Sequence, residues 1–170
     1  GPARGAIMPT IDAGGHKVFY VQRRPALARR PAVVLIHGAG GTHQQWLYQV
    51  RDLPSAATYA PDLPGHGRSE GPGRSLVASY GDWLPGFLDA LGLEKAVLVG
   101  HSMGGAIALD VALRFPERVA GLDHGEVARR GDCAVVIVHH TGKPPSASPD
   151  AWTGSLSASR CRFADGFCGS

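Results

Sequence analysis

The sequence of 170 residues has few cysteines and no long apolar run, and these absences exclude several classes of protein. The three cysteines, Cys133, Cys161 and Cys168, are an odd set without a C-x-x-C pair, so neither a disulfide framework nor a zinc site is indicated. There is no secretory signal and no apolar run long enough to span a bilayer. We therefore expect a soluble, cytoplasmic protein with no metal and no membrane partner.

Strong charge is also missing. The formal net charge is +3, and the arginines are scattered. The densest basic patch, Arg23-Arg24 with Arg29-Arg30, is better explained as a solvated loop between two strands than as a nucleic-acid site. The chain also has no G-x-x-x-x-G-K-[ST] phosphate loop. We expect no nucleic-acid partner and no cofactor.

The composition fits one globular unit with many turns. Hydrophobic residues make up 44% of the chain, which also has 24 glycines and 13 prolines. A chain of this length can bury one sizeable core.

The most informative motif is Gly-His-Ser-Met-Gly at residues 100–104. Glycine and serine are common here, so the pattern alone carries little weight. However, an apolar run of buried-strand type at 95–99 precedes it, and a mostly apolar helical run at 103–115 follows it. This context predicts a nucleophile elbow, a strained turn that exposes Ser102 between a strand and a helix. Ser102 is the candidate nucleophile.

Two more glycine-rich turns each follow a strand candidate. The buried-strand run at 31–36 ends in His-Gly-Ala-Gly-Gly at 37–41, whose backbone N–H groups could point at a developing oxyanion. The block Ala-Pro-Asp-Leu-Pro-Gly-His-Gly-Arg-Ser at 60–69 follows another short strand candidate. A single loop of this kind is usually only a tight turn, but three of them in this order are not easily a coincidence.

With these blocks, residues 8–122 resemble the α/β-hydrolase superfamily, in its esterase, lipase and epoxide-hydrolase-like branch. The resemblance implies that Ser102 is the nucleophile and that the backbone N–H groups of Ala39 and Met103 form the oxyanion hole. It gives His37 a structural role, and it places His66 and His101 in turns that shape the pocket floor rather than at the position of the general base. The implied substrate is a small ester-like molecule.

The periodicity predicts an α/β fold with a mostly parallel sheet and helices on both faces. We expect a β-hairpin over 8–22 through Gly14-Gly15, a strand over 32–37 and a short helix over 42–53 opened by Thr42. An amphipathic helix should follow and end at Gly92, with a kink at Pro85.

The chain changes character after Leu122. Fourteen of the fifteen leucines lie at or before that point, whereas all three cysteines and six of the eleven serines follow it. We therefore divide the chain into 1–122, the N-terminal part of a hydrolase core, and 123–170, a largely irregular tail with one strand-like run at 133–138. In the family, the segment after 122 would continue into a lid and the last strands, which carry the catalytic acid and histidine. Either the protein is a short hydrolase completed in an unusual way, or a truncated hydrolase is joined to foreign or frame-shifted sequence, and we favour the second.

The tail offers one candidate for the general base. If strand 134–138 pairs in parallel with 95–100, then His139 or His140 would lie at the same edge of the sheet as Ser102. A surface histidine pair is the alternative, since no acid is placed to orient either ring. Without a base, the chain would be a hydrolase with little turnover, or a non-catalytic binding module or incomplete gene product with a hydrolase-like fold.

Overall fold

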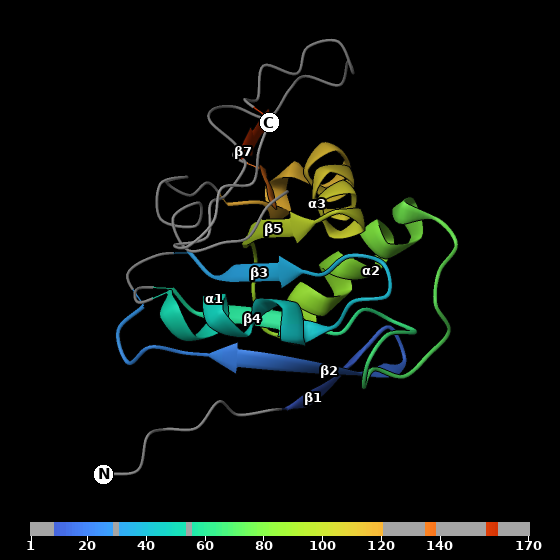
Figure 1. Ribbon diagram of the computed structural model, residues 1–170, viewed down its shortest axis with the longest axis horizontal. Coiled ribbons are helices and arrows are strands. Elements are labelled where there is room, and N and C mark those ends of the chain that lie inside the picture. The colour runs from blue at the N-terminus through green and yellow to red at the C-terminus, as the bar shows by residue number, and fades with distance from the viewer. Residues whose placement is uncertain (1–8, 29–30, 54–55, 121–134, 139–155, 160–170) are drawn as a thin grey trace, which may run out of the picture.

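The computed structural model describes residues 9–28, 31–53, 56–120, 135–138 and 156–159. The first half of the chain forms β1 (Thr10–Ala13), β2 (His16–Arg23), β3 (Val33–Ile36), the 3-10 helix η1 (His43–Trp46), α1 (Leu47–Asp52) and β4 (Thr58–Pro61). It continues through α2 (Val77–Ala90), β5 (Val97–His101), α3 (Met103–Arg114), the 3-10 helix η2 (Pro116–Arg118), β6 (Val135–Val138) and β7 (Leu156–Ser159) (Figure 1).

The strands form one mixed sheet in the order β1-β2-β4-β3-β5-β6-β7. At its centre β3 pairs in parallel with β4 and β5, as the helical connections between these strands require. The other pairings are antiparallel, beginning with the expected hairpin of β1 and β2. Gly14 and Gly15 form the hairpin turn with φ of 69° and 81°, a conformation that suits glycine at both positions of a two-residue turn.

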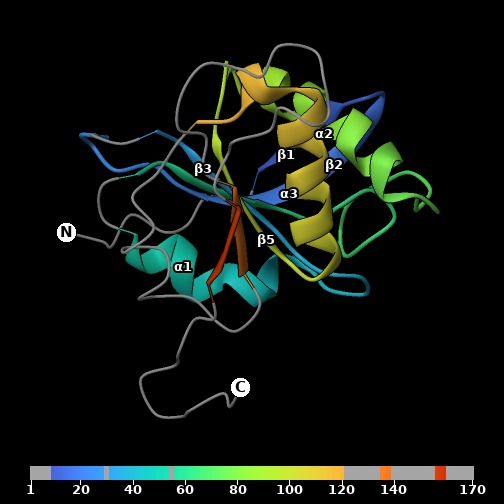
Figure 2. The ribbon, with the colours of Figure 1, turned by 90° about the horizontal axis from the view of Figure 1, so that it is seen from above.

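Helices cover both faces of the sheet. Figure 2 shows α1 on one side of the strands and α2 and α3 on the other. All four residues of β3 are buried, because it lies at the centre of the sheet and is covered on both faces. Two apolar cores result, one between the sheet and α2 with α3, the other between the sheet and α1. The predicted helices are present: Thr42 caps η1 by accepting a hydrogen bond from the Gln44 N–H, and α2 continues through Pro85.

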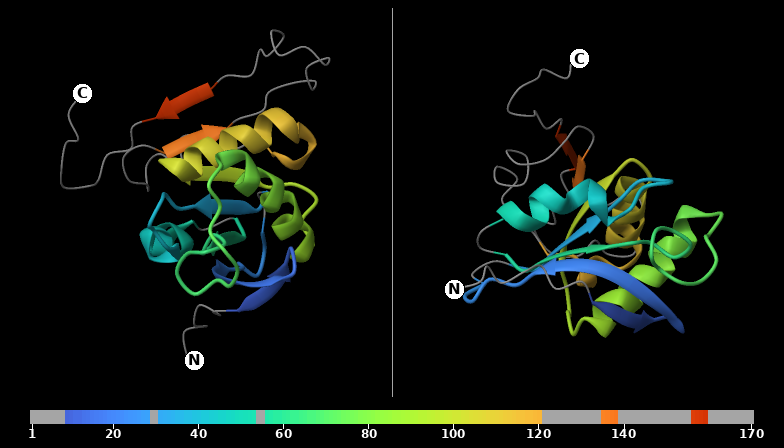
Figure 3. Two further views of the ribbon diagram at one scale, coloured as in Figure 1. Left: turned by 90° about the vertical axis from the view of Figure 1, so that its right-hand side faces the viewer. Right: turned by 60° about the horizontal axis from the view of Figure 1, so that its bottom comes forward.

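The direction of β6 differs from the one on which our candidate base depended. β6 pairs with β5 antiparallel, with Val135 opposite His101 and Ile137 opposite Val99. Figure 3 shows β6 and β7 as the last two strands of the sheet. Because β6 begins beside His101 and runs away from it, its carboxyl end lies at the opposite edge of the sheet from Ser102. The parallel pairing that we assumed is therefore wrong, whereas His139 and His140 themselves lie outside the described residues.

Within the described residues, none of the helices is both long enough and apolar enough to cross a membrane.

Candidate active site

Ser102 lies on the sharp turn between β5 and α3, as the motif predicts. Its φ of 53° and ψ of −117° make it the one non-glycine residue with positive φ among those described. A serine holds such a conformation only when its surroundings impose it, and this type of strain is concentrated at functional sites. The residue as a whole is exposed.

Two glycines of the motif allow the backbone segments around Ser102 to approach one another. A Cβ on Gly100 would overlap the backbone of Gly104 and Gly105, at the start of α3. A Cβ on Gly104 would overlap the carbonyl oxygen of Ile36 and would lie 2.7 Å from that of His37, at the end of β3. The two glycines therefore let α3 begin in direct contact with β5 and β3.

The loop at 37–41 lies beside this turn. A Cβ on Gly38 would be 3.2 Å from His101 Nδ1 and 3.3 Å from Ser102 Cβ. The next residue, Ala39, is exposed. Within the part of the chain that the structure describes, neither the Ala39 N–H nor the Met103 N–H donates a hydrogen bond. The Met103 N–H also lies at the N-terminus of α3, where the helix dipole favours negative charge.

His37 is fully buried and ties the loop to the turn that follows β4. Its Nδ1 is 2.7 Å from the Gly38 carbonyl oxygen, and its Nε2 accepts a hydrogen bond of 3.0 Å from the Leu63 N–H. Since Nε2 is an acceptor, the proton of the neutral ring is on Nδ1, which donates to Gly38. Burial lowers the pKa of His37, so the neutral form is favoured. These contacts agree with the structural role expected for this residue.

Asp62 organises the third glycine-rich block, a role that the sequence analysis did not assign. Its buried carboxylate accepts hydrogen bonds from His43 N–H at 2.6 Å, His43 Nδ1 at 2.9 Å and Arg68 N–H at 2.9 Å. A Cβ on Gly67, whose φ is 51°, would overlap this carboxylate. An aspartate directly after a strand and before a Gly-x-Gly turn is a usable sequence signal for such an anchor. No comparable signal marks His43 as its partner.

Of the two remaining histidines of the motifs, His66 lies in the turn region after β4, as expected, whereas His101 is the last residue of β5, directly before Ser102. His66 Nδ1 is 3.2 Å from the Pro64 carbonyl oxygen, and its ring centroid is 5.1 Å from that of His37. His101 Nδ1 is buried and has no hydrogen-bond partner among the described residues. No described histidine makes a hydrogen bond to the Ser102 hydroxyl, and the described residues contain no group of three or more side chains able to hold a metal ion.

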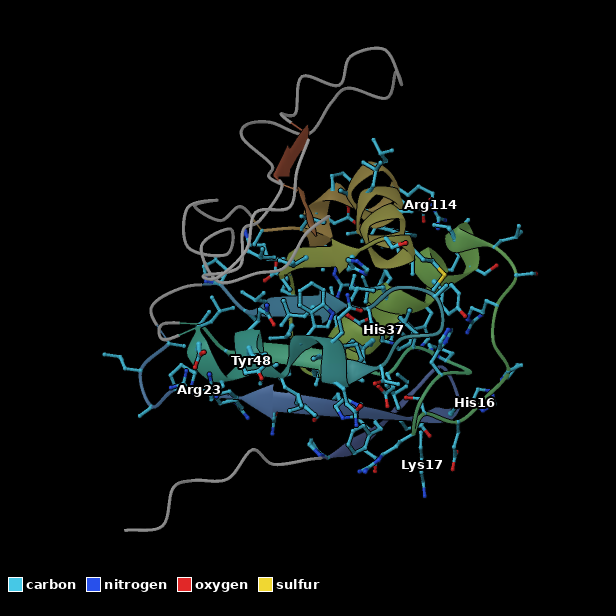
Figure 4. All side chains as sticks on the ribbon, in the orientation of Figure 1. His16, Lys17, Arg23, His37, Tyr48 and Arg114 are labelled. Atoms are coloured by element: carbon cyan, nitrogen blue, oxygen red, sulfur yellow. The ribbon has the colours of Figure 1, made fainter. Side chains whose placement is uncertain are left out.

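Figure 4 places His37 at the carboxyl end of β3, the edge of the sheet at which the turns after β3, β4 and β5 converge. This is the edge where open α/β sheets bind ligands. The site therefore combines an exposed, strained serine with two backbone N–H groups, those of Ala39 and Met103, that have no acceptor among the described residues.

The family follows from this fold and from a sequence match. Residues 31–122, more than half of the chain, match the family described as alpha/beta hydrolase fold, and the chain belongs to that family.

Individual relatives and solved structures agree. The chain is 37% identical over 110 residues to the dihydrolipoyllysine-residue acetyltransferase component of an acetoin cleaving system from Cupriavidus necator, covering 64% of this chain and 29% of the relative. It is 32% identical over 124 residues to 1-acylglycerol-3-phosphate O-acyltransferase ABHD5 of Sus scrofa, covering 67% and 34%. A membrane phospholipase A described as a bacterial virulence factor aligns with a TM-score of 0.63 and 31% identity, over 69% of this chain and 38% of the other. A predicted CIB-like hydrolase from Thermoplasma acidophilum aligns with a TM-score of 0.62 and 29% identity, over 69% and 60%.

The chain thus spans about a third of the length of these two curated relatives.

Proposed function

We propose that the protein is a serine hydrolase that cleaves a carboxylic ester or a related acyl bond through a covalent acyl-enzyme on Ser102. The observation that carries the proposal is the positive φ of Ser102 on an exposed strand-to-helix turn. The N–H groups of Ala39 and Met103 lie beside this turn and have no acceptor within the described part of the chain, which supports their role as the oxyanion hole.

The chemistry would proceed in two steps. The Ser102 hydroxyl attacks the carbonyl carbon of the ester, the carbonyl oxygen becomes an oxyanion between the Ala39 and Met103 N–H groups, and the alcohol leaves to give an acyl-enzyme. Water then attacks this acyl group and releases the acid. Both steps need a general base to take the proton of the nucleophile and return it to the leaving group. We keep His139 and His140 as candidate bases, although the antiparallel direction of β6 no longer favours them.

The relatives support an acyl-transfer reaction. One is described as a phospholipase A and another as a 1-acylglycerol-3-phosphate O-acyltransferase, and both names denote acyl chemistry. We therefore propose a small-molecule or lipid-derived ester as substrate.

A second candidate function is a non-catalytic module that binds a small apolar ligand or a protein partner at the same edge of the sheet. The observation that favours it is that no described histidine makes a hydrogen bond to Ser102. Loss of a triad member typically lowers kcat by about 10⁴-fold or more.

Ester turnover separates the two functions. We expect the wild-type chain to hydrolyse p-nitrophenyl acetate or butyrate with saturation kinetics, and the Ser102→Ala variant to fall to the rate of the buffer. The Ser75→Ala variant is the matched control, because Ser75 is an exposed serine just before α2 and should keep the wild-type rate. Equal rates for wild type and Ser102→Ala would contradict the hydrolase proposal and favour the binding module.

A further inference from the structure

We propose that His37, as the neutral Nδ1–H tautomer, is a positioning residue that fixes the orientation of the oxyanion donor at Ala39, and that acid releases this donor by protonating Nε2. The inference rests on the proposed function of Ser102. It goes beyond that function because it assigns a role to a buried side chain that does not touch the substrate, and because it makes the site sensitive to pH.

The first part of the proposal, that His37 orients the Ala39 N–H, rests on the geometry of the peptide unit between Gly38 and Ala39. The Gly38 carbonyl oxygen receives two hydrogen bonds, from His37 Nδ1–H at 2.7 Å and from the Gly41 N–H at 3.0 Å. In a planar trans peptide, the C=O of one residue and the N–H of the next point in opposite directions. With the Gly38 oxygen held toward the His37 ring, the Ala39 N–H must point away from the ring. It is also left without an internal acceptor among the described residues, as an oxyanion donor should be.

The other nitrogen of the His37 ring, Nε2, connects the loop at 37–41 to the rest of the fold. Nε2 accepts the Leu63 N–H, so the ring joins the loop after β3 to the turn after β4. Protonation of Nε2 would set two donors, the Leu63 N–H and the new Nε2–H, against each other across 3.0 Å. The ring would have to leave the Leu63 turn, and the Gly38 carbonyl that it holds would move with it.

Among the described residues, three titratable side chains act on the charge of the His37 ring, namely His43, Asp62 and His66. Burial is the largest cause of the lowered pKa of His37; His66 and His43 lower it further, and Asp62 and the hydrogen bond to Gly38 oppose the shift. The ring is therefore neutral at physiological pH, and an acid medium is needed to charge it.

The direct test uses the wild-type full chain, with no activity needed. Imidazole ¹⁵N NMR should show the Nδ1–H tautomer for His37 at pH 8. Amide exchange of the Leu63 N–H, corrected for the intrinsic pH dependence of exchange, should lose at least about tenfold of its protection as the His37 ring titrates. An Nε2–H tautomer, or Leu63 protection that is unchanged through the titration, would overturn the proposal.

Two variants separate the two bonds of the ring. His37→Asn can place an amide N–H near the Nδ1 position and keep the bond to Gly38, whereas His37→Gln can place an oxygen near Nε2 and keep the bond to Leu63. We expect fluorophosphonate to label Ser102 at least about tenfold more slowly in His37→Gln than in His37→Asn. For ester turnover, kcat should differ between the two variants in the same way, and KM should not. His16→Gln, which removes an exposed histidine at the start of β2, is the control and should match wild type.

The two proposals fail in different ways. If wild type is not labelled, the hydrolase function is wrong, and His37 then has no catalytic role. In that case the exchange of the Leu63 N–H still shows whether the ring holds the two loops together. Labelling of wild type with equal rates in His37→Asn and His37→Gln, or the reverse order, overturns the role of His37 alone. If either variant fails to fold, the measurements on wild type decide the matter.

Discussion

Replacing Gly104 by alanine tests whether α3 must begin in contact with β3. Alanine favours a helix over glycine by about 1 kcal/mol, so helix propensity alone predicts a gain in the free energy of unfolding. The added Cβ, however, would overlap the Ile36 carbonyl oxygen and would lie 2.7 Å from the His37 carbonyl oxygen. Both oxygens belong to the backbone at the end of a central, buried strand and cannot turn aside as a side chain could.

The overlap should outweigh the propensity. Overpacking of a core commonly lowers the free energy of unfolding by about 1–3 kcal/mol. Here the overlapped atoms belong to the backbone, which cannot move aside, so we expect a net loss of about 2 kcal/mol in the free energy of unfolding. A shift of α3 by roughly 1 Å would also displace Ser102 and lower the rate of fluorophosphonate labelling by about 100-fold.

Gly86 provides the matched control. It lies within α2, is exposed, and has no atom within 4 Å of an added Cβ. We expect Gly86→Ala to raise the free energy of unfolding by about 0.5–1 kcal/mol and to leave labelling unchanged. Urea denaturation at pH 8 measures both variants. The reasoning fails if Gly104→Ala is as stable as wild type or more stable.

Three further expectations concern stability, each measured by urea denaturation. Asp62→Asn should lower the free energy of unfolding by about 3 kcal/mol, because one amide oxygen cannot replace a buried carboxylate that accepts three hydrogen bonds. The control variant Asp12→Asn, at an exposed residue, should leave the free energy of unfolding nearly unchanged. A small effect of Asp62→Asn would show that the carboxylate is not an anchor. Phe87→Ala should cost about 3–5 kcal/mol, since its ring is fully buried, and a loss below about 1 kcal/mol would contradict its place in the core. The pKa of His37 is lowered from 6.5 in the folded chain. As the pH falls below about 6.5, the unfolded chain therefore takes up a proton that the folded chain excludes. The free energy of unfolding should then fall by up to about 1.4 kcal/mol per pH unit. This slope should be weaker in His37→Gln, and an identical slope would contradict the assignment.

Local features of the site could be predicted from the sequence. The turn at Ser102 depends on glycines close to it in the chain and on a strand and a helix that flank it directly, so the pattern of residues 95–115 is sufficient. The hairpin turn at Gly14-Gly15 is local in the same way.

Three features that join distant segments could not be predicted. The bond between Asp62 and His43 spans 19 residues and depends on how η1 packs against the end of β4. The direction of β6 depends on the path of the chain between β5 and β6, which a run of apolar residues does not specify, and for this reason the assumed parallel pairing was wrong. The tautomer of His37 follows only from the position of the Leu63 N–H, which belongs to another turn.

The central claim is that Ser102 is an activated nucleophile. The most direct measurement is to treat the full chain with a fluorophosphonate, digest it and locate the adduct by tandem mass spectrometry. We expect a single adduct on Ser102 that is absent from Ser102→Ala and unchanged in Ser75→Ala. An adduct on any other residue, or none on wild type under conditions that label a known serine hydrolase, would contradict the claim.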